Sequence, residues 1–189
     1  MCAGFTVYSG IRDAELRPGE RCAVVGVGGL GHLALQYAAA LGGEVVAVTR
    51  SEDKRAMLEE LGAAEVVVAG ENEVGAALER TGGVDVILHT ANSVEPSLTR
   101  GLRPYGRLSL MGVSDAEVRT TPKEMIFGKL RIVGSSQGPR HLLPEVVELH
   151  RRVRAKTIVE TYSLDEAPTA LERVESGTAR FRAVLVPTS

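Results

Sequence analysis

"VVGVGGLGHLALQ" (residues 24–36) is the most informative stretch in this chain of 189 residues. It contains Gly26, Gly28 and Gly31 in the spacing G-x-G-x-x-G. A β-branched run leads into these glycines, and an Ala/Leu-rich helical pattern follows them. The spacing by itself is weak evidence, but a position between a strand and a helix makes it informative. The stretch therefore predicts a strand, a tight turn and a helix in direct succession.

Each residue of this turn has its own predicted role. Gly26 allows the tight turn, Gly28 lets the backbone approach a pyrophosphate, and Gly31 lets the helix pack closely on the strand. Gly29 and Leu30 complete the turn, so that the first helical N–H groups and the positive end of the helix dipole meet the phosphates. The alternative is a glycine turn that serves packing alone. We interpret the motif as a dinucleotide-binding turn, because both its spacing and its flanks fit.

Short β-branched runs alternate with longer helical patterns through most of the chain. The predicted strands span residues 21–27, 44–50, 64–70, 84–90, 107–113 and 129–136. The predicted helices span residues 29–43, 51–62, 72–83 and 95–106, and Ser51 is expected to cap the second of them. This alternation is typical of an α/β fold with right-handed crossovers and helices on both faces of the sheet. We therefore predict a doubly wound parallel Rossmann sheet of about six strands.

The last part of the chain has a different order of predicted elements. Its predicted elements are, in order, a helix over 141–155, a strand over 157–164, a helix over 165–177 and a strand over 180–187. They predict a β-α-β appendage after the first helix, and not a further repeat of the sheet. We accordingly divide the chain into a dinucleotide-binding Rossmann domain, residues 1–140, and a C-terminal helix and β-α-β tail, residues 141–189.

The composition argues against several classes of protein. A net charge of −2 argues against a basic surface that binds nucleic acid. An aromatic content of 4% argues against a surface on which the bases of single-stranded nucleic acid stack. No apolar run approaches the length of a membrane span, about 18 residues, and there is no signal-peptide pattern. The two cysteines, Cys2 and Cys22, form no disulfide framework. We therefore predict a cytoplasmic protein with no nucleic-acid or membrane partner.

The end of the second predicted strand bears on the choice of dinucleotide. An NAD site places a carboxylate about 20 residues after the glycine turn, where it binds the ribose 2′-hydroxyl. Thr49 stands in that region here, and three basic residues lie close by, Arg50, Lys54 and Arg55. A hydroxyl with a guanidinium suits a 2′-phosphate, which a carboxylate would repel. We therefore predict NADP(H) in preference to NAD(H). The alternative is a set of solvated charges at a helix start, partly cancelled by the carboxylates of 52–53.

Several longer stretches carry a family resemblance. They are residues 2–63, "LRPYGRLSLMGV" (102–113), "FGKLRIVGSSQG" (127–138) and "RFRAVLVP" (180–187). These stretches resemble the zinc-type medium-chain alcohol dehydrogenases, in particular the NADP-dependent branch that is similar to cinnamyl alcohol dehydrogenases. The resemblance covers essentially the whole chain. It implies the C-terminal, dinucleotide-binding part of an oxidoreductase that transfers hydride between a nicotinamide and an alcohol or aldehyde.

The resemblance also implies part of a zinc site. Cys2 matches the third ligand of the family's catalytic zinc, whose other ligands come from an N-terminal catalytic domain. A catalytic zinc needs about three protein ligands. The other candidate side chains here are Cys22, His32, His89, His141 and His150. None of them forms a recognisable zinc signature with Cys2. We therefore expect an incomplete zinc site and a chain that alone is weak or inactive as a zinc dehydrogenase.

These five side chains have other expected places. Cys22 is expected in the core, because it lies in the strand before the turn, where a small apolar residue packs well. His32 is expected beside the phosphates or on the surface, and His89 is expected near the cofactor at the end of the fourth strand. His141 and His150 lie nine residues apart, which is not the i, i+4 spacing of a helical metal pair.

Further residues take their roles from the resemblance alone. Thr6 matches a threonine that lies near the nicotinamide ring. Met111 and Val113 match the end of the fifth strand, where a backbone carbonyl takes the carboxamide, and Ser135 matches the turn on the other side of that group. Arg182 matches an arginine that reaches the pyrophosphate through its guanidinium. For Arg182 the alternative is a surface arginine on a terminal strand.

The resemblance also bears on partners. Residues 115–122 match the edge through which family members pair their sheets, so we expect a homodimer. The strands over 157–164 and 180–187 match β-structure that completes the family's catalytic domain. Without that domain, these strands pair with each other, recruit another chain or are mobile.

The sequence leaves three functions possible for the chain. The first is the NADP(H)-binding portion of an alcohol dehydrogenase-like oxidoreductase that lacks most of the zinc site. The second is a free-standing NADPH-binding module that regulates or docks to a partner. The third is a truncated dehydrogenase repurposed for other small-molecule chemistry, in which Cys2 or His89 acts as nucleophile or acid/base. Neither of these two residues stands in a triad-like spacing.

Overall fold

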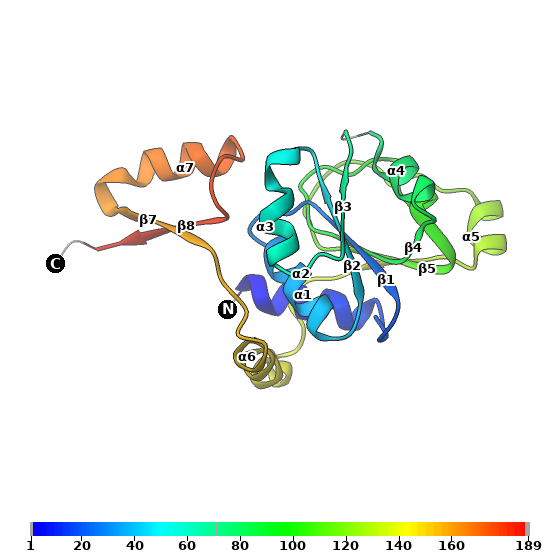
Figure 1. Cartoon of the computed structure of the whole chain (residues 1–189), viewed down its shortest axis with the longest axis horizontal. Helices are drawn as coiled ribbons and strands as arrows, with labels where there is room; N and C mark the ends of the chain where they lie inside the picture. Colours follow the sequence, from blue (N-terminus) through cyan, green and yellow to red (C-terminus); the bar gives the residue numbers. More distant parts are fainter. Residues whose placement is uncertain (1, 71, 188–189) are drawn as a thin grey trace. The chain divides into compact units, whose positions relative to one another are not determined.

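The computed structural model describes residues 2–70 and 72–187. Contacts between residues divide the chain into two compact units, with the boundary between Ala155 and Lys156. Figure 1 shows the helices and strands of both units. Within the described ranges, no helix combines the length and the apolar character that crossing a membrane requires. The cytoplasmic location stays a prediction.

The first unit alternates strands and helices. Its α-helices are α1 (Cys2–Asp13), α2 (Gly31–Ala40), α3 (Arg55–Glu60), α4 (Val74–Arg80), α5 (Pro122–Gly128) and α6 (Leu143–Arg152). Its strands are β1 (Arg21–Val25), β2 (Glu44–Thr49), β3 (Glu65–Val68), β4 (Val84–His89), β5 (Leu102–Leu110) and β6 (Arg131–Gly134). Its short 3₁₀ helices are η1 (Glu52–Lys54), η2 (Leu98–Gly101) and η3 (Arg140–Leu142). The glycine motif thus joins β1 to α2, as predicted.

The strands of the first unit form one parallel sheet in the order β3-β2-β1-β4-β5-β6. At the carboxyl end of β1, Val25 lies beside Val48 of β2 and His89 of β4. The order runs outward from β1 to β3 and then, on the other side, from β4 to β6. The winding therefore reverses between β1 and β4, beside the glycine turn. The predicted doubly wound parallel sheet is confirmed.

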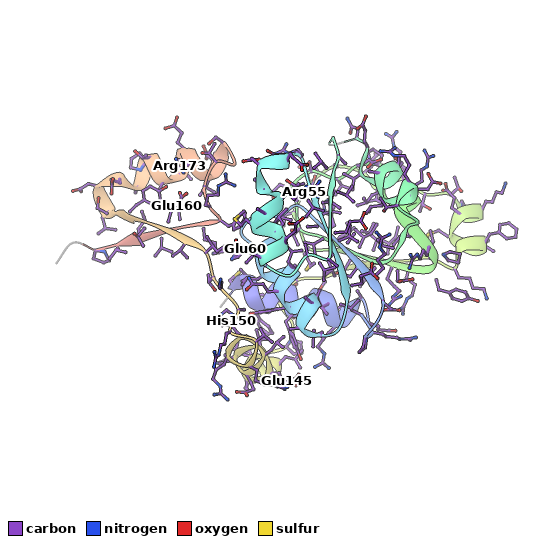
Figure 2. All side chains as sticks on the ribbon, in the orientation of Figure 1. Arg55, Glu60, Glu145, His150, Glu160 and Arg173 are labelled. Carbon is purple, nitrogen blue, oxygen red and sulfur yellow. The ribbon has the colours of Figure 1, made fainter. Side chains whose placement is uncertain are left out.

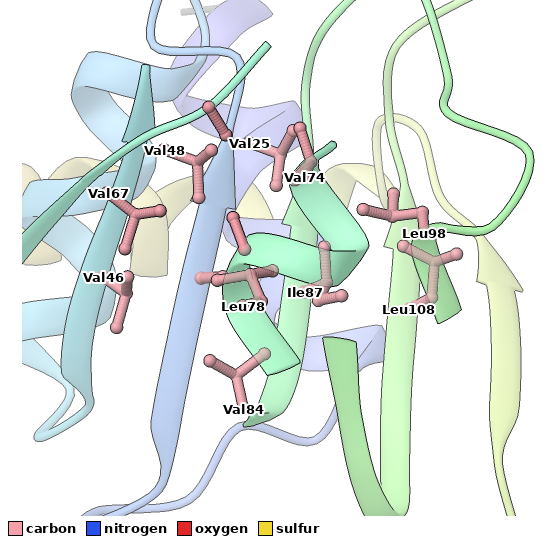
Figure 3. Close-up of a cluster of buried hydrophobic side chains, with 13 residues drawn as sticks. Val25, Val46, Val48, Val67, Val74, Leu78, Val84, Ile87, Leu98 and Leu108 are labelled. Carbon is pink, nitrogen blue, oxygen red and sulfur yellow. The ribbon is translucent and has the colours of Figure 1, made fainter. Parts of the chain in front are cut away.

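The central strands β1, β2 and β4 are buried on both faces of the sheet. On one face, Val25, Ile87 and neighbouring strand residues form an apolar cluster with Leu78 of α4 (Figure 3). Alternate side chains of a strand point to the opposite face, where Cys22 and Val24 are fully buried and α2 contacts β1 and β2. Burial on both faces explains why these strands are continuous apolar runs in the sequence. The expected place of Cys22 in the core is confirmed.

The predicted helix over 95–106 is wrong. Only the 3₁₀ turn η2 forms there, and β5 begins at Leu102, which pairs with Val84. The ladder then shifts register before it resumes at Arg107. Pro104 explains the outcome, because proline lacks the N–H that a helix interior needs, whereas a strand irregularity tolerates it.

Helix α6 belongs to the first unit. The carboxylate of Glu145 accepts hydrogen bonds from Tyr8 at 2.8 Å and from Arg12 at 2.7 Å, both on α1. The hydroxyl of Tyr37 on α2 lies 2.8 Å from Nδ1 of His150, and Figure 2 labels Glu145 and His150 on α6. The sequence pattern placed this helix in the C-terminal segment, whereas these contacts join it to the sheet-bearing unit.

The segment over 115–122, expected to be a dimer edge, contains no strand in the described structure. It is irregular up to Thr121, where a reciprocal capping box with Glu124 starts α5. The outer strand on this side of the sheet is β6. An edge that pairs with a second sheet would therefore be offered by β6 and not by residues 115–122.

The second unit is a β-α-β element. It comprises β7 (Val159–Ser163), η4 (Leu164–Glu166), α7 (Ala167–Glu175) and β8 (Arg182–Val186). Strands β7 and β8 pair in parallel, and Arg173 of α7 forms an ion pair of 3.0 Å with Glu160 of β7 (Figure 2). The predicted β-α-β appendage is confirmed. Of the three expected fates of its strands, pairing with each other is the one observed.

Candidate functional site

The glycine turn lies at the carboxyl edge of the sheet, where the winding reverses. Strand β1 ends at Val25, and the N–H of Thr90 bonds to the Val25 carbonyl at 2.9 Å, one residue beyond β4. In open α/β sheets, ligands bind in the crevice outside the carboxyl ends of the strands at such a reversal. The fold therefore places the candidate site at the turn between β1 and α2.

The three motif glycines face different surroundings. Gly26 has a φ of +90°, and a Cβ added to it would lie 2.7 Å from the backbone nitrogen of Ala91. A Cβ added to Gly31 would overlap the carbonyl oxygen of Gly26. A Cβ added to Gly28, in contrast, would meet nothing within 4 Å. Packing therefore closes in Gly26 and Gly31, whereas Gly28 borders open space from which a ligand can approach.

The N-terminus of α2 opens onto this turn. Its N-cap residue, Leu30, forms no side-chain capping bond, and the first turn contains no acidic residue. The first N–H groups of an α-helix lack partners within the helix and carry a partial positive charge. This helix end is therefore suited to an anionic group, and the site residues present fit the pyrophosphate of a dinucleotide.

The end of β2 contributes polar groups. Thr49 is buried, and its Oγ1 lies 3.3 Å from both the backbone N and the backbone O of Ser51. Arg50, the next residue, is exposed. The hydroxyl of Ser51 bonds to the carboxylate of Asp53 and makes no capping bond. The predicted side-chain cap is therefore wrong, since the Ser51 hydroxyl accepts no bond from the first turn.

Two more basic residues follow on the same segment. Lys54 is half-buried. The guanidinium of Arg55 (Figure 2) donates to the carboxylate of Glu52 at 3.0 Å and to the carbonyl of Val66 at 3.1 Å. The hydrogen bond from Arg55 lowers the pKa of Glu52. Arg55 is thus engaged within the fold, whereas the neighbouring Arg50 side chain reaches solvent.

Three further predicted cofactor residues lie at or beyond the ends of β5 and β6 in the first unit. Met111 is buried beside Gly10 of α1, and Val113 is almost fully exposed. Ser135 continues the sheet ladder through a bond of 2.9 Å from its N–H to the Leu110 carbonyl. The structure therefore brings the ends of β1, β2, β5 and β6 to one edge.

Two further predicted residues lie on other elements. Thr6 is buried in α1 of the first unit. Arg182 lies on β8 of the second unit. Their roles toward the cofactor stay predictions.

The residues present do not fit a complete zinc site. Among the described residues, no three His, Cys, Asp or Glu side chains gather closely enough to hold a metal ion. Cys2 is exposed at the start of α1, and burial raises the pKa of the Cys22 thiol, which keeps it protonated. Burial likewise lowers the pKa of His89, whose Nδ1 has no hydrogen-bond partner. No chemical step is therefore assigned to zinc.

Sequence reasoning missed two contributors to the turn. Thr90 and Ala91, which follow β4, contact Gly26 directly: the Thr90 hydroxyl donates to its carbonyl at 2.6 Å. His32 is not a surface residue, because it is fully buried and its Nδ1 lies 2.9 Å from the Gly28 carbonyl. The two polar residues at the end of the strand beside β1, His89 and Thr90, were the available signal for Thr90.

Comparison with known families gives a match to the family described as "Zinc-binding dehydrogenase" over residues 29–152. The chain belongs to the zinc-binding dehydrogenase family. This dehydrogenase-family chain is 34% identical over 192 residues to an alcohol dehydrogenase of Geobacillus stearothermophilus. The match covers 98% of the chain and 56% of that relative. The chain spans about half the length of the curated relatives that it matches.

Solved structures give the same result. A cinnamyl alcohol dehydrogenase from Sorghum bicolor has a TM-score of 0.86 at 28% identity, covering 97% of this chain and 53% of that one. A CAD from Helicobacter pylori complexed with NADP(H) has a TM-score of 0.82 at 25% identity, covering 97% and 52%. The first unit therefore has the dinucleotide-binding fold of the alcohol dehydrogenases. The family resemblance is confirmed, and its NADP-dependent branch stays a prediction.

Proposed function

We propose that this chain binds NADP(H) and is the cofactor-binding part of an alcohol dehydrogenase-type oxidoreductase. The observation that carries the proposal is the open space at Gly28, in a turn where Gly26 and Gly31 are both closed in by packing. The backbone is thus accessible at the one motif position where a pyrophosphate has to approach it. The uncapped N-terminus of α2 supplies the electrostatic attraction for that anion.

In this proposal, the chain's own groups bind and orient the cofactor. The turn over residues 26–31 and the positive end of the α2 dipole bind the pyrophosphate. The backbone at Met111 and Val113, with Ser135, holds the carboxamide and so fixes the orientation of the nicotinamide ring beside Thr6. The bound nicotinamide would supply the hydride exchange with an alcohol or aldehyde.

The preference for NADP(H) rests on the end of β2. Arg50 offers an exposed guanidinium, and Thr49 offers no negative charge. Of the two carboxylates that follow Arg50, Glu52 accepts from Arg55 and Asp53 accepts from the Ser51 hydroxyl, so both are engaged within the segment. Lys54 adds a second cation to the same segment. The related Helicobacter pylori structure, which is complexed with NADP(H), supports the same preference.

The zinc chemistry of the family needs more ligands than the described residues provide. Cys2 would supply one zinc ligand, and no group of three possible ligands is present among the described residues. We expect the chain as given to bind the dinucleotide and to show weak or no alcohol oxidation. Ordinary rates of NADPH-dependent aldehyde reduction by the purified chain would contradict this expectation.

We further propose a homodimer that pairs through the β6 edge of the sheet. Strand β6 is the outer strand, and an outer strand carries backbone groups that can pair with another chain. Ile126 and Phe127 on the neighbouring α5 expose 68% and 79% of their surfaces, and Val113 is also exposed. Exposed apolar side chains on the helix that precedes this outer strand in the chain favour association between copies.

Calorimetric titration of the chain with NADPH and with NADH, with metal analysis of the same sample, tests the proposed function. We expect NADPH to bind more tightly than NADH. A matched variant, Gly28→Ala, places a methyl group in the open space and should weaken NADPH binding at least about tenfold. Its melting temperature should stay close to that of the wild type, because the methyl group meets no atom of the protein. Failure of the wild type to bind either nucleotide would overturn the proposal.

A further inference from the structure

The carbonyl oxygens of two motif glycines, Gly26 and Gly28, each accept two hydrogen bonds. The Gly28 oxygen accepts from the N–H of His32 at 3.1 Å and lies 2.9 Å from His32 Nδ1. The Gly26 oxygen accepts from the N–H of Gly28 at 3.0 Å and from the hydroxyl of Thr90 at 2.6 Å. A carbonyl oxygen has two lone pairs, so each oxygen has two partners for its two acceptor sites.

The His32 contact fixes the position of a ring proton. A carbonyl oxygen can only accept, so Nδ1 of His32 carries the hydrogen in this bond. The side chain is 0% exposed, and a buried polar ring is kept in place by the hydrogen bonds it makes. His32 therefore holds the Gly28 carbonyl with two donors, one from its backbone and one from its ring.

Thr90 reaches the turn from the neighbouring strand. Its hydroxyl donates to Gly26, and its N–H bonds to the carbonyl of Val25 at 2.9 Å. A Cβ on Gly31 would lie 3.1 Å from this hydroxyl, tighter than an ordinary contact. The absence of a side chain at Gly31 thus gives Thr90 room beside the turn, a reason for glycine in addition to helix–strand packing.

Peptide geometry links these two contacts to ligand binding. The peptide units of the turn are trans, so a carbonyl and the N–H that follows it point in opposite directions. Holding the Gly26 and Gly28 oxygens toward buried side chains directs the next N–H groups, those of Val27 and Gly29, the other way. A carbonyl oxygen turned toward a phosphate would repel it, whereas an N–H attracts it.

We propose that His32 and Thr90 are positioning residues for the dinucleotide pyrophosphate. They act through the backbone, by keeping the carbonyl oxygens of Gly26 and Gly28 away from the anion. This inference rests on the proposed function, because it needs a phosphate at the turn. It assigns a role to a strand-end threonine and to a buried histidine that the glycine motif does not contain.

Paired variants test the inference by NADPH titration. His32→Leu and Thr90→Val remove the donors at similar volume, and each should raise the NADPH dissociation constant about three- to tenfold. His32→Asn keeps an N–H donor near the position of Nδ1, and Thr90→Ser keeps the hydroxyl. These two rescue variants should bind within about twofold of the wild type. Equal weakening by the leucine and asparagine variants would indicate packing alone and overturn the role of His32.

The tautomer of His32 gives a readout that is independent of binding. Nitrogen-15 NMR of the free protein should show a protonated Nδ1, and an Nε2–H tautomer with a bare Nδ1 would overturn the assignment.

If the wild type binds neither nucleotide, the proposed function fails while the tautomer still tests the contact. If the wild type binds and both donor-free variants bind as tightly, this inference fails and the proposed function stands. Should His32→Leu not fold, the Nδ1 tautomer decides for His32, and the isosteric Thr90→Val decides for Thr90.

Discussion

Arg50 is the residue on which the choice of dinucleotide depends in our proposal. We predict that Thr49→Asp combined with Arg50→Ser weakens NADPH binding about 10- to 100-fold, the cost of losing a charge-assisted hydrogen bond and gaining a repulsive carboxylate. NADH lacks the 2′-phosphate, so its affinity should stay the same or increase. Titration of the double variant with both nucleotides measures the difference.

Arg151→Asp is the charge-matched control for that variant, because both change the net charge by about two units toward negative. Arg151 is exposed on α6 and pairs with Glu148, so the change does not touch the segment after β2. NADPH should bind this control as it binds the wild type. Equal weakening by the control and the double variant would mean that only the overall charge matters, and would contradict a specific contact at Arg50.

Residue roles that depend on spacing could be predicted from the sequence, and roles that depend on the facing direction of a side chain could not. The place of Cys22 in a central strand followed from its apolar neighbours. His32 was expected at the phosphate edge or on the surface, yet it is buried, because the orientation of α2 on the sheet decides which side of its first turn faces inward. Ser51 has the usual chemistry of a cap, but its hydroxyl donates to Asp53 and accepts no bond from the helix.

Among the elements, β5 is tied to the segment before β1 by a buried arginine. Arg107 donates to both carboxylate oxygens of Glu20, at 3.0 and 2.6 Å, and to the carbonyl of Ala14 at 2.9 Å. Burial opposes ionisation of Glu20, but the hydrogen bonds from Arg107 and from the Arg17 backbone outweigh it and lower the pKa of this carboxyl. The ion pair thus joins two elements at the amino end of the sheet.

We predict that Glu20→Gln lowers the free energy of unfolding at pH 7 by about 1–3 kcal/mol, the range for a hydrogen bond to a charged group. Because the folded-state pKa is lowered, the contribution of the carboxylate is fully present above its unfolded pKa, about 4.3. It is lost as the pH falls through the folded value. The difference between variant and wild type should therefore shrink in acid, as measured by urea unfolding at several pH values.

Glu15→Gln provides the comparison for Glu20. Glu15 pairs with Arg131 at 3.0 Å, but both side chains are about half exposed, and exposed ion pairs contribute little. This control should therefore change the stability at pH 7 less than Glu20→Gln does. A larger effect of the control, or a Glu20→Gln effect that persists at low pH, would contradict the assigned role of the Arg107–Glu20 pair.

The elements themselves could be predicted where burial leaves a clear pattern. Strands β1, β2 and β4 are continuous apolar runs because both faces of the sheet are covered. The predicted helix over 95–106 was wrong because the segment contains parts of two different elements, η2, which ends at Gly101, and β5, which begins at Leu102. Periodicity does not report where one element ends and the next begins, and Pro104 was the better guide.

For the whole molecule, we predict a homodimer in solution that Phe127→Asp converts to a monomer. A carboxylate at this exposed apolar position on α5 would be buried without a partner in an interface, which is unfavourable. Analytical ultracentrifugation of the wild type and the variant measures the change. Leu171→Asp is the matched control, since Leu171 is also exposed and apolar but lies on α7 of the second unit. A monomeric wild type, or dissociation of both variants, would contradict pairing at β6.

At this scale, the sequence allowed the sheet class and the parallel winding to be predicted, because strands alternate with helices along the chain. The division into units could not be predicted in the same way. It depends on which surface α6 contacts, and the bonds of Glu145 and His150 to α1 and α2 join residues more than 100 positions apart. Such contacts leave no local pattern in the sequence.

The bond from Thr90 to Gly26 has a consequence for the order of events during biosynthesis. The two residues are 64 positions apart, so a nascent chain that has emerged only as far as β3 already contains the complete glycine motif. It still lacks the donor that turns the Gly26 carbonyl away from the ligand. Non-local contacts of this kind form late, after the loop between them has closed. The motif and its capacity to bind nucleotide are therefore acquired at different times, and nucleotide binding would report that β4 has docked beside β1.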